Sequence, residues 1–278
     1  MQTIILLFKN KKNFVIYFKY FSLKNLNQKI NEMQSQIIKF LLLIFFLISS
    51  CIDNKKKHLF ILSGQSNMVL LNEEETFIPI LEKKFGKNMI LVVKDAKGGE
   101  PIRRWYKKWN KKSKENYNLN PINEFGEDSI GNLYDKLITK VKKITIDKKI
   151  ESISFIWMQG ERDARENLAQ YYEKSLFGLY DQLSKDLNRE NINFIIGRIN
   201  DFDLKNLNYK HWTKIREIQV KFAESNDKFS WIDTDDLNDG YNKKGDSINN
   251  DLHMSVKGYK TLGKRFAEKA IELIVNNN

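Results

Sequence analysis

The chain has 278 residues, of which 41% are hydrophobic and 29% charged, and this composition can form one sizeable core. It excludes disordered and collagen-like chains, and a single cysteine excludes a disulfide scaffold. One cysteine and three scattered histidines form no cluster with the spacing of zinc ligands, so we expect neither a metal ion nor another cofactor.

The formal charge of +12 is concentrated near the N-terminus. The first 50 residues contain seven lysines and one glutamate, which leaves 40 basic against 34 acidic side chains in the rest of the chain. Lysine and asparagine are spread along the sequence instead of forming one basic stripe, which indicates biased composition and not a phosphate-binding surface. We therefore expect no nucleic-acid partner.

Residues 33–51 have the pattern of an export signal. Met33 begins a short polar segment, nine apolar residues follow from Phe40 to Ile48, and two serines precede Cys51. Nine apolar residues are too few for a transmembrane helix, because crossing ~30 Å of hydrocarbon takes roughly 20. Residues 1–32 precede this complete signal, so we interpret them as an upstream start-site extension and exclude them from the fold.

The segment Ile48-Ser49-Ser50-Cys51 resembles a bacterial lipobox. The resemblance implies cleavage before Cys51 and lipidation of its thiol, and a plain secretory signal is the alternative. Several acyl chains anchor a protein firmly, so we expect an exported protein held to a membrane surface without crossing it. The domain organisation is then a signal segment over residues 1–50, a tether over 51–57 and one folded domain over 58–278.

Beyond Lys57, short apolar runs alternate with amphipathic segments. Five runs have the length and apolarity of strands buried on both faces: His58–Ser63, Met89–Val93, Ser152–Met158, Asn193–Ile196 and Phe229–Ile232. Helical spacing predicts helices over Ile130–Ile146, Leu168–Leu187, His211–Ala223 and Val256–Val275. This alternation predicts an α/β fold with a parallel sheet. The polar segment Trp105–Phe125 has no periodicity and predicts a long surface loop that rims a site.

Four polar segments follow predicted strands or precede the last helix, where open α/β sheets bind their ligands. They are GQSNM at 64–68, GGEPIRRW at 98–105, QGERD at 159–163 and NDLHMS at 250–255. Taken alone, Ser66 is more typical of a helix N-cap than of a nucleophile, and His253 equally suits a helix cap. Met68 stands where the nucleophile elbow of α/β-hydrolases has its second glycine, so Ser66 does not belong to that motif.

In this order the four segments resemble the SGNH (GDSL-like) hydrolases, and specifically the sialic acid-specific acetylesterases of carbohydrate esterase family 6. The similarity rests on GQSNM, GGEPIRRW, WMQGERD and DLHMSVKGYKTLGKRFA, and it covers residues 58–272. It implies a three-layer α/β/α sandwich around a five-stranded parallel sheet in flavodoxin-like order. It also implies a serine esterase that removes acetyl groups from carbohydrates.

The resemblance assigns roles to the residues that match the family. Ser66 is implied as the nucleophile that forms an acetyl-serine, and His253 as the base that takes its proton. The implied oxyanion hole consists of the backbone N–H groups of Ser66 and Gly99 and the side-chain amide of Gln159.

One position departs from the family pattern. The family places its acid three residues before the histidine, where this chain has Asn250, with Asp251 one residue later. An asparagine can orient an imidazole but cannot stabilise its cation by charge. We predict that Asp251 substitutes for the missing acid. A Ser66–His253 dyad and an inactive relative that only binds sugar are the alternatives.

The substrate is predicted from the residues around the site. Arg103 and Trp105 suggest a carboxylate clamp and a sugar-stacking face for an acidic sugar such as acetylated sialic acid, although a solvated surface would look the same. Glu161 is a further candidate for substrate binding, and both Glu161 and Asp163 also suit hydrogen-bond acceptors that organise a loop. Acetylated xylan, other polysaccharides and cell-envelope glycans are alternative substrates.

Two functions from other classes compete with the acetylesterase. A noncatalytic carbohydrate-binding surface lipoprotein would account for Asn250 and for the signal segment. An SGNH lipase or thioesterase would share the fold and the serine, but the WMQGERD segment favours the sugar-esterase branch.

Overall fold

The computed structural model describes residues 4–10, 13–19, 23–49, 55–109 and 129–276. The chain divides into two compact units, Met1–Asn54 and Lys55–Asn278. In the first unit, β1 (Ile4–Asn10) pairs antiparallel with β2 (Asn13–Lys19), and α1 spans Leu23–Ser49. None of the helices in the described ranges has both the length and the apolarity to cross a membrane. Cys51, the predicted lipidation site, lies outside the described residues.

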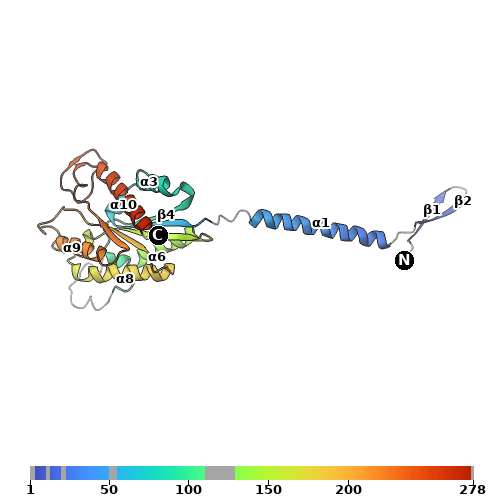
Figure 1. Ribbon diagram of the computed structural model, residues 1–278, viewed down its shortest axis with the longest axis horizontal. Coiled ribbons are helices and arrows are strands. Elements are labelled where there is room, and N and C mark those ends of the chain that lie inside the picture. Colours follow the sequence, from blue (N-terminus) through green and yellow to red (C-terminus); the bar gives the residue numbers. More distant parts are fainter. Residues whose placement is uncertain (1–3, 11–12, 20–22, 50–54, 110–128, 277–278) are drawn as a thin grey trace. The chain divides into compact units, whose positions relative to one another are not determined.

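Figure 1 shows the second unit, which contains the labelled helices α3, α6, α8, α9 and α10. It is built on a five-stranded parallel sheet with the strand order β4-β3-β5-β6-β7. The strands are β3 (Lys57–Gly64), β4 (Ile90–Ala96), β5 (Ile150–Met158), β6 (Asn193–Gly197) and β7 (Phe229–Ile232). The chain goes from β3 outward to β4 and then returns to the other side of β3 as β5, which is the flavodoxin-like order. The predicted α/β sandwich is therefore confirmed.

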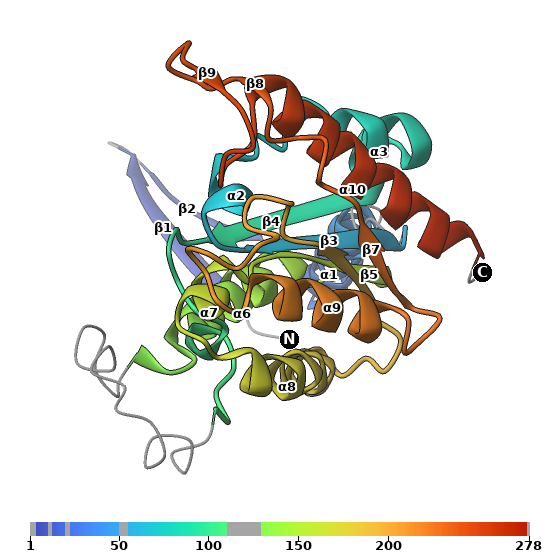
Figure 2. The ribbon, with the colours of Figure 1, turned by 90° about the vertical axis from the view of Figure 1, so that its left-hand side faces the viewer.

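Helices cover both faces of the sheet (Figure 2). The longer ones are α3 (Phe77–Phe85), α6 (Asn132–Thr145), α8 (Ala169–Leu187), α9 (Trp212–Ala223) and α10 (Val256–Asn276). Short ones are α2 (Ser66–Leu70), η1 (Lys87–Met89), η2 (Ile102–Arg104) and α7 (Glu161–Arg165), and β8 (Gly240–Tyr241) pairs with β9 (Ser247–Ile248). Helices α6, α8 and α9 pack on one face and α3 and α10 on the other.

Side chains along each strand point alternately to the two faces of the sheet, and they contribute to two hydrophobic cores, one on each face. In β3, Leu59 and Ile61 face the core under α6, α8 and α9, whereas Phe60 and Leu62 face the core under α3 and α10. Because both faces are covered, the strand is apolar along most of its length and not only at every second residue.

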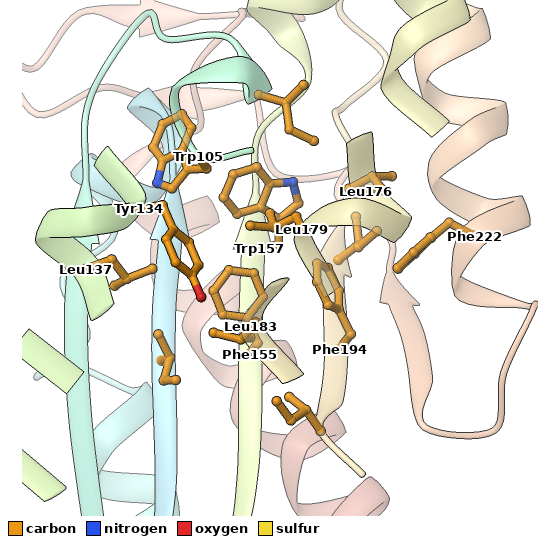
Figure 3. Packing of buried hydrophobic residues seen from close by; sticks show 14 of the residues in the cluster. Trp105, Tyr134, Leu137, Phe155, Trp157, Leu176, Leu179, Leu183, Phe194 and Phe222 are labelled. Carbon is orange, nitrogen blue, oxygen red and sulfur yellow. The ribbon is translucent and has the colours of Figure 1, made fainter. Parts of the chain in front are cut away.

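The predicted surface loop begins with a residue that is not on the surface. Trp105 is fully buried, and its ring packs edge-on against Trp157 of β5 with 5.2 Å between ring centroids (Figure 3). Trp109 is also buried. Sequence periodicity missed this because the two tryptophans are apolar anchors within a polar segment. Residues 110–128, the remainder of the predicted loop, lie outside the described residues.

Candidate active site

Ser66, Gly99 and Gln159 follow β3, β4 and β5, at the carboxyl edge of the sheet, and Asp251 and His253 lie in the loop before α10. Strand β3 is the point where the strand order reverses, and open α/β sheets bind ligands beside this point. Ser66 is the first residue of α2, two residues after β3 ends. It is partly buried, while its neighbour Asn67 is buried.

Gly64 makes the sharp turn that presents Ser66. Its φ is +140°, and a Cβ at this position would lie only 1.9 Å from the carbonyl oxygen of Met158. The next residue, Gln65, donates its backbone N–H to the same carbonyl at 2.8 Å. Only glycine permits the chain at position 64 to approach the Met158 carbonyl so closely. This contact with the end of β5 therefore fixes the place at which α2 begins.

The glycine pair after β4 lies against the serine. A Cβ added to Gly98 would lie 3.7 Å from the Cβ of Ser66, and Gly99 has a φ of +71° with open space where a Cβ would lie. Among the described residues, the backbone N–H groups of Ser66 and Gly99 have no hydrogen-bond acceptor. Both donors predicted from the backbone are therefore available to a ligand.

Gln159 has a different arrangement from the one that we predicted. Its side chain is fully buried, and Nε2 faces three acceptors, namely Asp163 Oδ2 at 2.6 Å, the carbonyl of Glu100 at 3.2 Å and Gln65 Oε1 at 3.3 Å. An amide nitrogen has two protons, so none is left for a substrate oxygen. In this conformation Gln159 joins three loops, and its amide nitrogen faces protein acceptors.

Two buried carboxylates organise the loop after β5. Asp163 Oδ2 also accepts the backbone N–H of Ile102 at 2.8 Å, and burial raises the pKa of Asp163 to about 7 although both hydrogen bonds lower it. Glu161 Oε1 accepts from Asn67 Nδ2 at 2.8 Å, and burial raises the pKa of Glu161 as well. With 2% of Glu161 exposed, its contacts favour loop organisation over the substrate binding that we also considered.

Arg103 and Trp105 do not form the predicted sugar-binding surface. Arg103 Nη1 lies 2.5 Å from Glu166 Oε2, and the Arg103 side chain is only 6% exposed. Trp105 has no exposed face on which a sugar could stack. The polar context of GGEPIRRW suggested a surface, but the charge of Arg103 is neutralised inside the domain and Trp105 belongs to the core. The structure therefore places both of these predicted substrate-binding side chains inside the domain.

His253 lies in the loop before α10 and is partly buried. Asp251 Oδ1 accepts a hydrogen bond from the backbone N–H of His253 at 2.8 Å. The carboxylate of Asp251 therefore contacts the main chain of His253. Asn250 contacts other partners, with Oδ1 accepting from Asn238 and Nδ2 donating to the carbonyl of Phe202. Among the described residues, no carboxylate forms a hydrogen bond with the imidazole ring.

Two asparagines that we did not single out in the sequence hold this loop in place. Asn200 Nδ2 donates to the carbonyl of Asp251 at 3.1 Å, and Asn238 Nδ2 donates to the same carbonyl at 3.0 Å. Each is 1% exposed. Asn200 comes three residues after the end of β6, so the rule that ligands and their supports lie beyond strand ends could have identified it.

In the part of the chain that the structure describes, no three His, Cys, Asp or Glu side chains are arranged to hold a metal ion. The chemistry that the site offers is that of a serine beside free backbone donors, with a histidine on a neighbouring, well-anchored loop.

Solved structures share this fold. A protein from Arabidopsis thaliana is 17% identical with a TM-score of 0.56, over 78% of this chain and 99% of that chain. A carbohydrate acetylesterase from Xanthomonas citri is 15% identical with a TM-score of 0.55, over 78% of this chain and 57% of that chain. NanS is 11% identical with a TM-score of 0.54, over 78% of this chain and 97% of that chain. No curated protein sequence matches the chain.

The sequence itself matches the family described as carbohydrate esterase, sialic acid-specific acetylesterase, over residues 71–272. This range contains Gly98 and Gly99, the QGERD segment and His253, and it begins five residues after Ser66. The match covers most of the chain and agrees with the observed fold. The chain therefore belongs to this family of carbohydrate acetylesterases and is a carboxylic ester hydrolase.

Proposed function

We propose that the protein removes O-acetyl groups from carbohydrates through an acetyl-serine intermediate on Ser66. The observation that carries this proposal is the position of Ser66, at the start of a helix and against the Gly98–Gly99 backbone, with unpaired N–H groups on both segments within the described residues. Such donors stabilise the negative charge that develops on a carbonyl oxygen during acyl transfer.

In the proposed reaction, Ser66 Oγ attacks the acetyl carbonyl while His253 takes its proton. The N–H groups of Ser66 and Gly99 hold the resulting oxyanion. The intermediate collapses to acetyl-Ser66, and the imidazolium returns the proton to the departing sugar oxygen. A water molecule then gives a proton to His253 and attacks the acetyl-serine. The imidazolium returns this proton to Ser66 Oγ as the bond to the acetyl group breaks, and the acetic acid leaves as acetate and a proton. Losing one oxyanion donor is expected to lower kcat on the order of a hundredfold.

Asp251 is the third member of the proposed site. It follows the position at which the family has its acid, and it already contacts the main chain of His253. Its negative charge, two residues from the imidazole, would favour the imidazolium that forms during attack. A Ser66–His253 dyad without charge support is the alternative.

Acetylated sialic acid and acetylated polysaccharides are the proposed substrates. The test measures acetate release by the purified protein from acetylated sialic acid, from acetylated xylan and from p-nitrophenyl esters of increasing chain length. A carbohydrate acetylesterase releases acetate from a sugar and prefers the shortest ester, whereas an SGNH lipase or thioesterase turns over long acyl chains faster. A noncatalytic binding protein shows glycan binding without release from any substrate.

We also propose that the protein is exported and held to a membrane by a lipid on Cys51. The support is the sequence of the signal, in which nine apolar residues and two serines precede the only cysteine. The test is detergent partitioning after labelling of cells with a radioactive fatty acid. Wild type is expected to carry label and partition into detergent, and Cys51→Ser is expected to do neither. An unlabelled wild-type protein found in the medium would favour a plain secretory signal.

A further inference from the structure

A buried hydrogen-bond network joins the helix that carries Ser66 to the loop that carries His253. Its centre is Asn67, the residue after the serine, which is 1% exposed. Asn67 Nδ2 donates to Glu161 Oε1 at 2.8 Å and to the backbone carbonyl of Leu252 at 3.2 Å. The nucleophile's neighbour is thus bonded to the residue directly before the histidine.

Tyr259 of α10 completes the network from the other side. Its hydroxyl donates to Asn67 Oδ1 at 2.8 Å and accepts the backbone N–H of Met254, the residue directly after His253, at 3.3 Å. Burial raises the pKa of Tyr259, so the hydroxyl keeps its proton and remains a donor. The two side chains therefore hold the main chain on both sides of His253.

The chemistry of the partners fixes the orientation of the Asn67 amide. Its nitrogen faces two acceptors, the Glu161 carboxylate and a carbonyl, and its oxygen faces the one hydroxyl donor, Tyr259. The Asn67, Glu161 and Tyr259 side chains are buried, so water cannot readily replace a partner lost among them. Removing the Tyr259 hydroxyl would leave Asn67 Oδ1 without a donor and Met254 N–H without an acceptor.

We propose that Asn67 and Tyr259 are positioning residues that set the placement of His253 relative to Ser66. This inference rests on the proposed roles of Ser66 and His253 as nucleophile and base. Proton transfer between them requires hydrogen-bond reach, about 2.6–3.2 Å, and a misplacement of about 1 Å can lower the rate on the order of a hundredfold. A small movement of the His253 loop therefore slows each step that uses the imidazole, while the binding of the sugar is unaffected.

The test uses Tyr259→Phe in the full chain and an organophosphonate ester that labels reactive serines. Two quantities are measured: the rate constant of labelling, which reports how well His253 activates Ser66, and the final labelled fraction, which reports how many molecules are folded and competent. We expect Tyr259→Phe to lower the labelling rate and the kcat for acetate release on the order of tenfold, with the KM and the labelled fraction of wild type.

The matched control is Tyr134→Phe. Tyr134 is also buried, and its hydroxyl donates to Asp186 Oδ2 at 2.8 Å, a contact between α6 and α8 that involves none of the predicted site residues. This variant also loses a tyrosine hydroxyl and its hydrogen bond, here to the exposed carboxylate of Asp186, and is expected to keep the wild-type labelling rate. A second variant, Asn67→Ala, is expected to be labelled more slowly than wild type, as Tyr259→Phe is. In the double variant the two effects on the labelling rate should not multiply, because both substitutions break the same network.

The outcomes separate this inference from the function on which it rests. Suppose that wild type is labelled and that Tyr259→Phe is labelled at the wild-type rate, or differs only by a smaller labelled fraction. This result overturns the positioning role and leaves the esterase proposal intact. A wild type that takes no label on Ser66 and an unimpaired Ser66→Ala variant overturn both.

Discussion

The carboxylate of Asp163 accepts a 2.6 Å hydrogen bond from the side-chain amide of Gln159, in a position where neither group is exposed by more than 1%. The same carboxylate oxygen binds the backbone of Ile102, so one buried acid ties the loop after β5 to the loop after β4. The glycine pair that flanks Ser66 lies in the second of these loops.

This acid makes the stability of the protein depend on pH. Burial raises the pKa of Asp163 to about 7, above the ordinary value of 3.8 for an aspartate. When the pH lies between these two pKa values, Asp163 keeps its proton in the folded protein and has released it in the unfolded chain. The free energy of unfolding therefore decreases as the pH rises from about 4 to about 7 and then levels off. This group contributes up to roughly 4 kcal/mol to the decrease. Glu161, whose pKa is also raised by burial, contributes in the same direction.

Urea unfolding of wild type and Asp163→Asn across this pH range measures the contribution. The asparagine variant cannot titrate, so its free energy of unfolding should decrease less steeply with pH than that of wild type. Parallel curves for the two proteins would show that the Asp163 carboxyl titrates normally in the folded state.

Asp251 and Asn250 are expected to contribute very differently to catalysis. Asp251→Ala removes both the acceptor of the His253 backbone N–H and the nearby negative charge, so kcat should fall at least tenfold. Asn250→Ala should retain most of the activity, because Asn250 contacts Asn238 and Phe202 and not His253. Steady-state acetate release by both variants gives the ranking, and the reverse order would exclude Asp251 as the third member of the site.

Asp251→Asn separates charge from hydrogen bonding. Its amide oxygen can still accept the backbone N–H, but it cannot stabilise an imidazolium by charge. We expect kcat to fall nearly as far as in Asp251→Ala. Activity close to that of wild type would reduce Asp251 to a backbone acceptor and favour the Ser66–His253 dyad.

Arg103 is expected to matter for stability and not for substrate affinity. Its guanidinium pairs with Glu166 inside the domain, and removing one partner of a buried ion pair typically costs about 3–5 kcal/mol. Arg103→Ala should therefore lower the free energy of unfolding in urea by a few kcal/mol, roughly in that range. The KM of the folded fraction for acetylated sialic acid should stay unchanged, and a large rise in KM would restore Arg103 to the substrate site.

Much of the fold could be predicted from the sequence because its strands are short and apolar throughout. The runs Asn193–Ile196 and Phe229–Ile232 coincide with β6 and β7 to within one residue. Helix α3 escaped prediction because Phe77–Phe85 is only nine residues long and contains Pro79 in its first turn. Prolines are tolerated there in a structure but weaken the sequence signal.

The site could be predicted only in part. Ser66, Gly99 and His253 lie in motifs that the sequence displays, and their segments do follow the strand ends and precede α10. The burial of Arg103 and Trp105 depends on Glu166 and Trp157, which are more than 50 residues away in the chain. The bond between Asn67 and Tyr259 spans 192 positions. Pairings of this kind are set by tertiary packing, and no local sequence pattern predicts them.

The central claim is that Ser66 is the nucleophile of a carbohydrate acetylesterase. Its most direct test is acetate release from an acetylated sugar by wild type and by Ser66→Ala, with circular dichroism to show that the variant is folded. The account predicts steady release by wild type and a rate at least a thousandfold lower for the folded variant, on the order expected when an activated nucleophile is removed. Release by Ser66→Ala at the wild-type rate would contradict the claim.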